Sequence, residues 1–436
     1  MSTRIGSLAG LVAAALTAGA IAATPAAAAW SQPFNLSKDG QNASQPRVAT
    51  DDNGAVFAWV RPVSGHLLVQ ARMRPFNAGS LTPIQDISPA GEDAFNPEVA
   101  IDTDGDAVIT WASSDGTIQA RRRAADGTLS EVQDLSGPGA SLPQVGMAQE
   151  GDAVITWQRP IGEDTRIQAR ARAEDGTLGP VQNLSASGSD ASDPEVGVDG
   201  SSDAVFVWRR QLATATRVQA RARSAVDGSL TGVQTLSGEN GNAFEPEVAV
   251  DDTGDAVFSW RRTDGTVQRV ETRVRAFLTG ALTQVQKLSP AGVAGQDAFQ
   301  PQVAVDADGD AVFTWRRFDG TDSRIQTRAR TLLSGALSAV QDLSGSGEDA
   351  FEPQVAVSRV DADPDAVFTW RRFDGTNQRI QARTRSAAGV LGAVRDVSAA
   401  GENGFDPRVG VDQDGVAYAT WHRDITVDRV AGAKGP

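Results

Sequence analysis

The sequence predicts an all-β fold, an eight-bladed β-propeller made of four-stranded antiparallel blades. A unit of about 52 residues recurs eight times, and each unit holds four strand patterns separated by turn residues. The last unit lacks its fourth strand, whereas an isolated strand pattern precedes the first unit. We therefore expect the N-terminal strand to complete the last blade and close the ring, which removes the exposed sheet edges.

A tryptophan and a Pro-x-Val triplet mark each unit. The valine and the tryptophan lie 12 residues apart in six of the eight units. We expect each triplet to begin a strand, because proline is tolerated at that place. The tryptophans are Trp59, Trp111, Trp157, Trp208, Trp260, Trp315, Trp370 and Trp421.

The sixth unit shows the four strands most clearly. They are expected over residues 302–305, 310–316, 324–330 and 337–344. In the second of them, Ala311, Phe313 and Trp315 share one face, and Val312 lies on the other. Both faces are largely apolar, as a sheet packed between two others requires. We accordingly expect the tryptophans to pack between blades rather than to form platforms for sugars.

The two ends of the repeat supply the strand that closes the ring. Residues 30–37 resemble the fourth-strand pattern of residues 391–398. The last unit stops after a poor third-strand pattern at residues 427–431. We expect a single propeller domain over residues 30–436.

Residues 1–29 are expected to be a secretory signal peptide outside the fold. Arg4 precedes an apolar run, and four alanines end the segment. A membrane anchor is the alternative, although no charged stop follows the run. We expect a secreted protein, released or retained at the cell surface, with no membrane association after cleavage.

Composition excludes several classes of function. The chain of 436 residues carries a net charge of −15, which argues against nucleic-acid binding. It has no cysteine and only two histidines, so thiolate chemistry is excluded and imidazole chemistry nearly so. We expect no cofactor and no metal, and we expect a monomer.

Asp-rich turns recur in the repeat, for example at residues 306–310. Alternating carboxylates that end in glycine are typical of calcium loops, but this loop is short for the six to eight oxygens that Ca²⁺ takes. Aspartate and glycine are also ordinary turn residues. The pattern favours structural turns, with calcium as the alternative.

Arginine supplies nearly all the positive charge, and four units carry Trp-Arg-Arg at the end of the second strand. We expect these and the third-strand arginines to form ladders with acidic residues of adjacent strands. The alternative is a ring of arginine that binds anionic glycans or cell-wall polymers. The arginines assigned to such a rim are Arg262, Arg317 and Arg372.

Phenylalanine recurs in the connection that leads from the fourth strand to the next unit. In a propeller this connection shares a rim with the loops between strands two and three, and that rim is the expected binding face. Asp93, Asp297 and Asp349 lie close by in sequence. The alternative is that each ring fills a gap between blades. The candidate residues are Phe95, Phe244, Phe299, Phe351 and Phe405.

The motifs Pro-x-Val-Ala-x-Asp, Gly-Asp-Ala-Val-x-x-Trp and Gln-Ala-Arg together resemble the repeats of secreted actinobacterial propellers of unassigned role. The resemblance covers residues 30–436 and implies the fold far more than an activity.

The favoured function is a non-catalytic binding or scaffolding module that recognises a glycan, a cell-envelope polymer or an extracellular protein on the rim. An alternative is a carbohydrate hydrolase or lyase that uses carboxylates of irregular loops. A sialidase-like mechanism would need a tyrosine nucleophile, and Tyr418 is the only tyrosine. A third reading is a purely structural ring.

Overall fold

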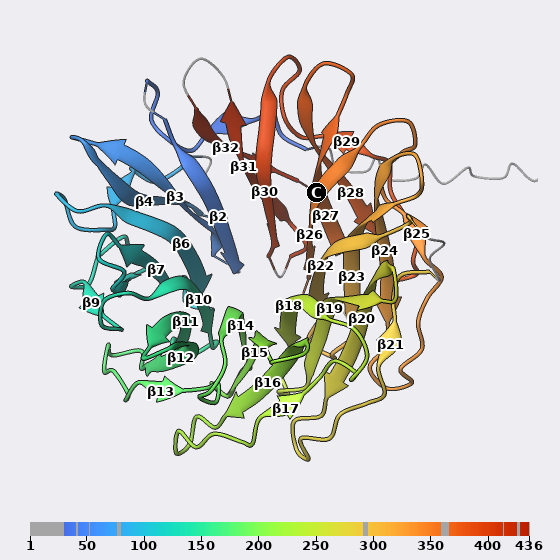
Figure 1. Ribbon diagram of the computed structural model, residues 1–436. Helices are drawn as coiled ribbons and strands as arrows, with labels where there is room; N and C mark the ends of the chain where they lie inside the picture. Colours follow the sequence, from blue (N-terminus) through green and yellow to red (C-terminus); the bar gives the residue numbers. More distant parts are fainter. Residues whose placement is uncertain are drawn as a thin grey trace, which may run out of the picture.

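The computed structural model describes residues 30–435, except residues 41, 52, 76–79, 291–294, 359–365, 413 and 425–427. The described residues form eight four-stranded antiparallel sheets arranged as the blades of a ring (Figure 1). This arrangement confirms the predicted fold. The expected signal peptide, residues 1–29, lies outside the described residues. Within the described part of the chain, no helix is long and apolar enough to cross a membrane.

Each blade contributes its first strand to the inside of the ring and its fourth strand to the outside. The innermost strands are β2 (Ser44–Asp51), β6 (Ala94–Ile101), β10 (Ser141–Met147), β14 (Ala191–Val198), β18 (Ala243–Val250), β22 (Ala298–Val305), β26 (Ala350–Val357) and β30 (Asn403–Val411). The second strands are β3 (Gly54–Val63), β7 (Ala107–Ser113), β11 (Ala153–Ile161), β15 (Ala204–Gln211), β19 (Ala256–Asp264), β23 (Ala311–Phe318), β27 (Ala366–Phe373) and β31 (Ala417–Asp424).

The outer half of each blade consists of a long third strand and a short fourth strand. The third strands are β4 (His66–Pro75), β8 (Ile118–Arg123), β12 (Asp164–Arg172), β16 (Thr216–Arg223), β20 (Val267–Arg275), β24 (Ser323–Arg330), β28 (Gln378–Arg385) and β32 (Arg429–Lys434). The outermost strands are β5 (Gln85–Asp86), β9 (Gln133–Asp134), β13 (Gln182–Asn183), β17 (Gln234–Thr235), β21 (Gln286–Lys287), β25 (Gln341–Asp342), β29 (Arg395–Asp396) and β1 (Phe34–Asn35). Blades 1 to 7 follow chain order from β2, and blade 8 combines β30, β31, β32 and β1.

The core lies between neighbouring blades. Trp315 and Phe313 of blade 6 are fully buried in a cluster with residues of blade 5, such as Val270. Val312, on the other face of the same strand, packs in the next cluster along the ring with Trp370. All eight repeat tryptophans are fully buried, so they fill the core as expected.

Third-strand arginines link each of blades 1 to 7 to the blade before it in the ring. Arg328 donates from Nε to the carbonyl of Ser338 in its own blade (2.6 Å) and from Nη1 to the carbonyl of Leu288 in blade 5 (3.3 Å). Arg330 donates to Oε1 of Gln286 in blade 5 (2.8 Å). The sequence predicts ladders with acidic residues of adjacent strands, and Arg324 and Arg379 form such ion pairs with Asp342 and Asp396 of the fourth strands. For Arg328 and Arg330 the acceptors are instead carbonyl and amide oxygens, in their own blade and in the preceding one.

The N-terminal segment occupies the place of a fourth strand in blade 8. Phe34 pairs with Gly432 and Asn35 with Ala431 in antiparallel register. The Oγ atom of Ser37 accepts a hydrogen bond from the backbone of Val430 (3.1 Å), which is the role that Ser344 plays in blade 6. The predicted closure is therefore consistent with the pairing of the two ends.

Two strand boundaries differ from the expectation. The triplet proline does not begin the innermost strand: β22 starts at Ala298, three residues before Pro301, and a bulge between Phe299 and Gln302 accommodates the proline. A bulge leaves one residue out of the ladder, so the missing N–H of proline costs no hydrogen bond there. The fourth strand is shorter than expected, because regular pairing is confined to β25 and one isolated bridge between Arg330 and Leu337.

The closure of the ring can be tested at Leu36, whose side chain is fully buried in blade 8. We expect Leu36→Ala to lower the free energy of unfolding by about 2–5 kcal/mol, because it leaves a cavity at the seam. Deletion of residues 30–37 should lower the melting temperature further and expose the edge of β32 to self-association. Chemical denaturation and size-exclusion chromatography with light scattering measure both effects. Lys38→Ala, at an exposed neighbouring position, is the control. Unchanged stability and monodispersity of the deletion variant would show that the seam is not closed in this way.

Candidate functional site

Four of the five predicted phenylalanines lie together with arginines on one face of the ring. Each phenylalanine stands near the start of an innermost strand and is half-buried. The residue before it, such as Ala298 or Ala350, is the one that is buried between blades. The gap-filling position is therefore taken by alanine in blades 5 to 7 and by Gly404 in blade 8, and the aromatic ring is left partly accessible.

Phenylalanine and arginine side chains alternate from blade 4 to blade 8. Each guanidinium carbon lies 4.7–5.9 Å from the centroid of a ring, within the range of cation–π attraction. We call this row the Phe–Arg belt. In order around the ring its members are Arg209, Phe244, Arg261, Phe299, Arg316, Phe351, Arg371 and Phe405. His422 ends the row, 6.1 Å from Phe405.

The arginines of the belt are the first members of the Trp-Arg-Arg sequences. Arg316 pairs across the strands with Phe299. The second members, which the sequence assigned to the rim, bind the loop that leads into their own blade. Arg262 donates to the carbonyl of Asn240 (2.7 Å), Arg317 to Oε1 of Gln296 (2.8 Å) and Arg372 to the carbonyl of Ser346 (3.1 Å).

Phe95 stands apart from the belt. Its cross-strand neighbour in blade 2 is Ala112, and no arginine is stacked on it among the residues that the structure describes. The belt is thus a feature of one sector of the ring.

The aspartates near the phenylalanines accept hydrogen bonds from the backbone of the preceding blade. Asp297 accepts a hydrogen bond from the backbone of Gln268 in the preceding blade (2.7 Å), and Asp349 accepts one from Ser323 (2.6 Å). Asp93 does the same for Leu67 (2.8 Å). These carboxylates hold the loops that border the belt.

The residue after each phenylalanine sets the charge of the belt. The residue at this position has a left-handed backbone conformation with φ between 50° and 55° in all eight blades, including the three in which serine replaces the phenylalanine, and it is never glycine. In three blades its carboxylate forms an ion pair with the belt arginine of the same blade. The pairs are Asp193–Arg209 (3.0 Å), Glu245–Arg261 (3.0 Å) and Glu352–Arg371 (2.8 Å). In blade 6 this position holds Gln300.

The same residues connect one blade to the next. The backbone N–H of Gln300 donates to Oε2 of Glu245 (2.8 Å), and that of Asp406 donates to Oε2 of Glu352 (3.1 Å). The bulge therefore directs the side chains of Glu245 and Glu352 towards the following blade. Their hydrogen bonds hold neighbouring blades at the distance that separates successive members of the belt.

A second polar row lies one step further along the innermost strands, at the residue after each proline. Arg47 and Glu98 form an ion pair at 2.7 Å. Burial raises the pKa of Glu247 to about 8, although Gln302 donates a hydrogen bond to it (2.8 Å). Burial also lowers the pKa of Arg408 to about 10.

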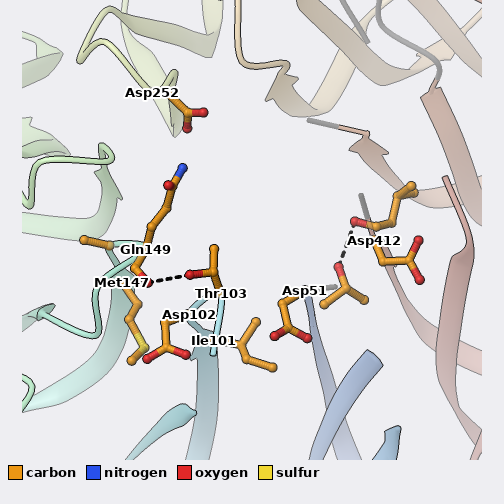
Figure 2. Close-up of a pocket in the computed structure, with 11 residues that line it drawn as sticks. Asp51, Ile101, Asp102, Thr103, Met147, Gln149, Asp252 and Asp412 are labelled. Carbon is orange, nitrogen blue, oxygen red and sulfur yellow. Dashed lines mark hydrogen bonds between the residues drawn. The ribbon is translucent and has the colours of Figure 1, made fainter. Parts of the chain in front are cut away.

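A cavity of about 280 Å³ opens at the other end of the innermost strands. Figure 2 shows Asp51, Asp102, Asp252 and Asp412 around it, with Gln149 between them. The carboxylate of Asp102 accepts hydrogen bonds from two amides of its own turn, those of residues 104 (3.0 Å) and 106 (2.9 Å). Among the described residues, no three or more histidine, aspartate or glutamate side chains are grouped closely enough to hold a metal ion. The hydrogen bonds that Asp102 accepts within its own turn are typical of structural turn residues.

Tyr418 is fully buried in the core, 6.5 Å from Phe57. Burial raises the pKa of its hydroxyl to about 12. This position argues against a tyrosine nucleophile.

Comparison with known proteins supports the fold. No family model and no curated protein matches the chain. A solved ulvan lyase of polysaccharide lyase family 25 is similar with a TM-score of 0.52 at 9% identity, over 78% of this chain and 93% of the lyase. The BP39L lectin from Burkholderia pseudomallei is similar with a TM-score of 0.50 at 12% identity, over 82% of this chain and 100% of the lectin.

A prolyl endopeptidase structure has a TM-score of 0.50 at 13% identity and covers 88% of this chain, but the match spans only 55% of the peptidase. Propellers with these likenesses therefore include a lectin, a lyase and a protease. At such identities the likeness extends to the fold alone.

The turn aspartates predict a pH dependence of stability. Burial raises the pKa of Asp306 from 3.8 to about 6, and its Oδ2 atom has no hydrogen-bond partner. Because the folded chain holds this proton more tightly than the unfolded chain, stability is gained as the pH falls from 6 to 4 and lost as it rises through 6. We expect Asp306→Asn to reduce this gain by on the order of 1–2 kcal/mol. Denaturant unfolding at pH 5 and pH 7.5 measures it.

The control is Asp308→Asn, since Asp308 is an exposed residue of the same turn. Equal pH dependence in the wild-type protein and in Asp306→Asn would contradict the prediction.

Proposed function

We propose that the protein is a non-catalytic binding module that recognises a glycan along the Phe–Arg belt. The observation that carries the proposal is the row of four half-buried phenylalanine rings, spaced by guanidinium groups over adjacent blades. Aromatic rings offer an apolar face to the C–H groups of a sugar, and arginine N–H groups donate to its oxygens.

The belt suits an extended ligand better than a single sugar. Its aromatic members repeat once per blade from blade 5 to blade 8, so a chain molecule that follows the row meets several equivalent contacts. Shallow sites that act together raise the overall affinity without any one of them being strong. A polymer of the cell envelope or of the surroundings is the ligand that this arrangement favours.

The similar structures agree with this proposal at the level of the fold. One is a lectin, and another is a polysaccharide lyase. A secreted or surface-retained protein, as the N-terminal segment of the sequence suggests, would meet such glycans outside the cell.

The proposal is tested by binding to a glycan array and to insoluble polysaccharides. We expect the double variant Phe299→Ala/Phe351→Ala to lose at least tenfold in affinity for the glycan that the wild-type protein binds, because two stacking faces are removed. The matched control is Phe95→Ala, which changes the same position of the repeat outside the belt.

Retained binding in the double variant would place the site elsewhere. If the wild-type protein bound no glycan on the array and no polysaccharide, the proposed function would be wrong.

A further inference from the structure

Arg316 differs from the other arginines of the belt in forming no ion pair, although Glu245 and Asp349 lie near enough to raise its pKa against the larger effect of burial. Arg209, Arg261 and Arg371 each form an ion pair with the residue that follows the phenylalanine position of their own blade. In blade 6 that residue is Gln300. Among the described residues, no carboxylate forms an ion pair with Arg316, and no side chain or carbonyl accepts a hydrogen bond from its guanidinium.

The guanidinium of Arg316 is nevertheless held in place. Its central carbon lies 4.7 Å from the centroid of Phe299 and 5.2 Å from that of Phe351. The Nε atom is buried without a partner. Burial lowers the pKa of Arg316, but an arginine side chain stays protonated in proteins. The Arg316 guanidinium is therefore preorganised to bind an anion. Its N–H groups are free to donate, and its side chain loses little conformational entropy on binding.

We infer that Arg316 is the binding site for an acidic sugar, a uronate or a sulfated residue, within the glycan that follows the belt. This inference rests on the proposed function and adds the chemical class of the ligand. The planar fork of a guanidinium matches the paired oxygens of a carboxylate or a sulfate. The flanking rings of Phe299 and Phe351 contact the sugar that carries the acidic group.

The charges near Arg316 favour a glycan in which acidic sugars are isolated among neutral ones. The belt arginines on both sides, Arg261 and Arg371, are already neutralised by Glu245 and Glu352. The whole chain carries a net charge of −15. The net negative charge of the chain disfavours a densely charged anionic polymer, whereas a mostly neutral glycan with single acidic branches gains the contact with Arg316 at a smaller cost in repulsion.

The repeat itself supplies the sharpest test. The variant Gln300→Glu gives blade 6 the acidic residue that blades 5 and 7 already have, in the same backbone conformation, with φ of 52° at Gln300 and 53° and 55° at Glu245 and Glu352. The new carboxylate keeps the oxygen that accepts the backbone hydrogen bond of Glu352. We expect a folded protein in which Arg316 is neutralised.

The probes are a xylotriose that carries one glucuronate, the same oligosaccharide with its carboxyl group reduced, xylotriose with one sulfate, and trigalacturonate. Isothermal titration calorimetry measures the affinity for each. We expect the wild-type protein to prefer the singly acidic probes over the reduced one by about tenfold or more, and over trigalacturonate as well. Gln300→Glu should remove this preference and leave the affinity for the reduced probe unchanged. The carboxylate and sulfate arms identify which acidic group is bound.

Glu352→Gln provides the opposite change. It releases Arg371 from its ion pair while keeping an oxygen for the backbone of Asp406, so a second unpaired arginine appears beside the first. We expect the affinity for the singly acidic probes to rise severalfold. Arg372→Met is the control, because this arginine lies on the other face of the same strand and binds the carbonyl of Ser346.

The outcomes separate this inference from the proposed function. Equal binding of acidic and reduced probes, or an unchanged preference in Gln300→Glu, would overturn the acidic-sugar site; if both probes still needed Phe299 and Phe351, the glycan-binding function would stand. If none of these probes bound while the array gave a neutral glycan, the inference alone would fail. If the wild-type protein bound no glycan of any kind, both the acidic-sugar site and the glycan-binding function would be wrong.

Discussion

The packing of the second strands is the constraint on which the rest of the structure depends. Both faces of β23 are apolar, and Trp315 is enclosed by side chains of the preceding blade while Val312 packs towards the following one. A single blade cannot bury both faces, so each blade needs a neighbour on either side. A closed ring meets this need for all eight blades at once, and the pairing of β1 with β32 supplies the last contact.

The polar residues fall into two groups. One group makes the same contacts between blades in most of the repeats, and the other differs from blade to blade. The arginines near the end of the third strand, such as Arg328 and Arg330, use neutral acceptors in the preceding blade, so the cohesion between blades that they provide does not depend on the ionisation of carboxylates. The Phe–Arg belt, in contrast, occupies only one sector, and its charge changes at Gln300. A repeated scaffold thus carries a surface that is not repeated, which a specific ligand requires.

The number of blades, the order of the strands and the closure of the ring were predictable from the sequence, because the repeat period and the complementary ends are long-range signals. The membership of the belt was not. The Pro-x-Val triplet predicts that a strand begins at Pro301, which would leave Phe299 in a loop. The bulge instead continues the strand through the proline and places Phe299 opposite Arg316 rather than near Arg317. Arg316 and Arg317 lie on opposite faces of β23 because side chains alternate along a strand. Which of the two lies next to Phe299 depends on the register between β22 and β23, and the bulge shifts that register.

The discontinuous blade has a consequence for the order in which the molecule assembles. Seven sheets are each continuous in sequence, so each can form from a local stretch of chain. The eighth draws its strands from both ends, and the contact between Ser37 and Val430 spans 393 positions. The entropic cost of bringing such distant segments together falls on this one joint. We therefore expect the pairing of β1 with β32 to form last during folding and to open first during unfolding.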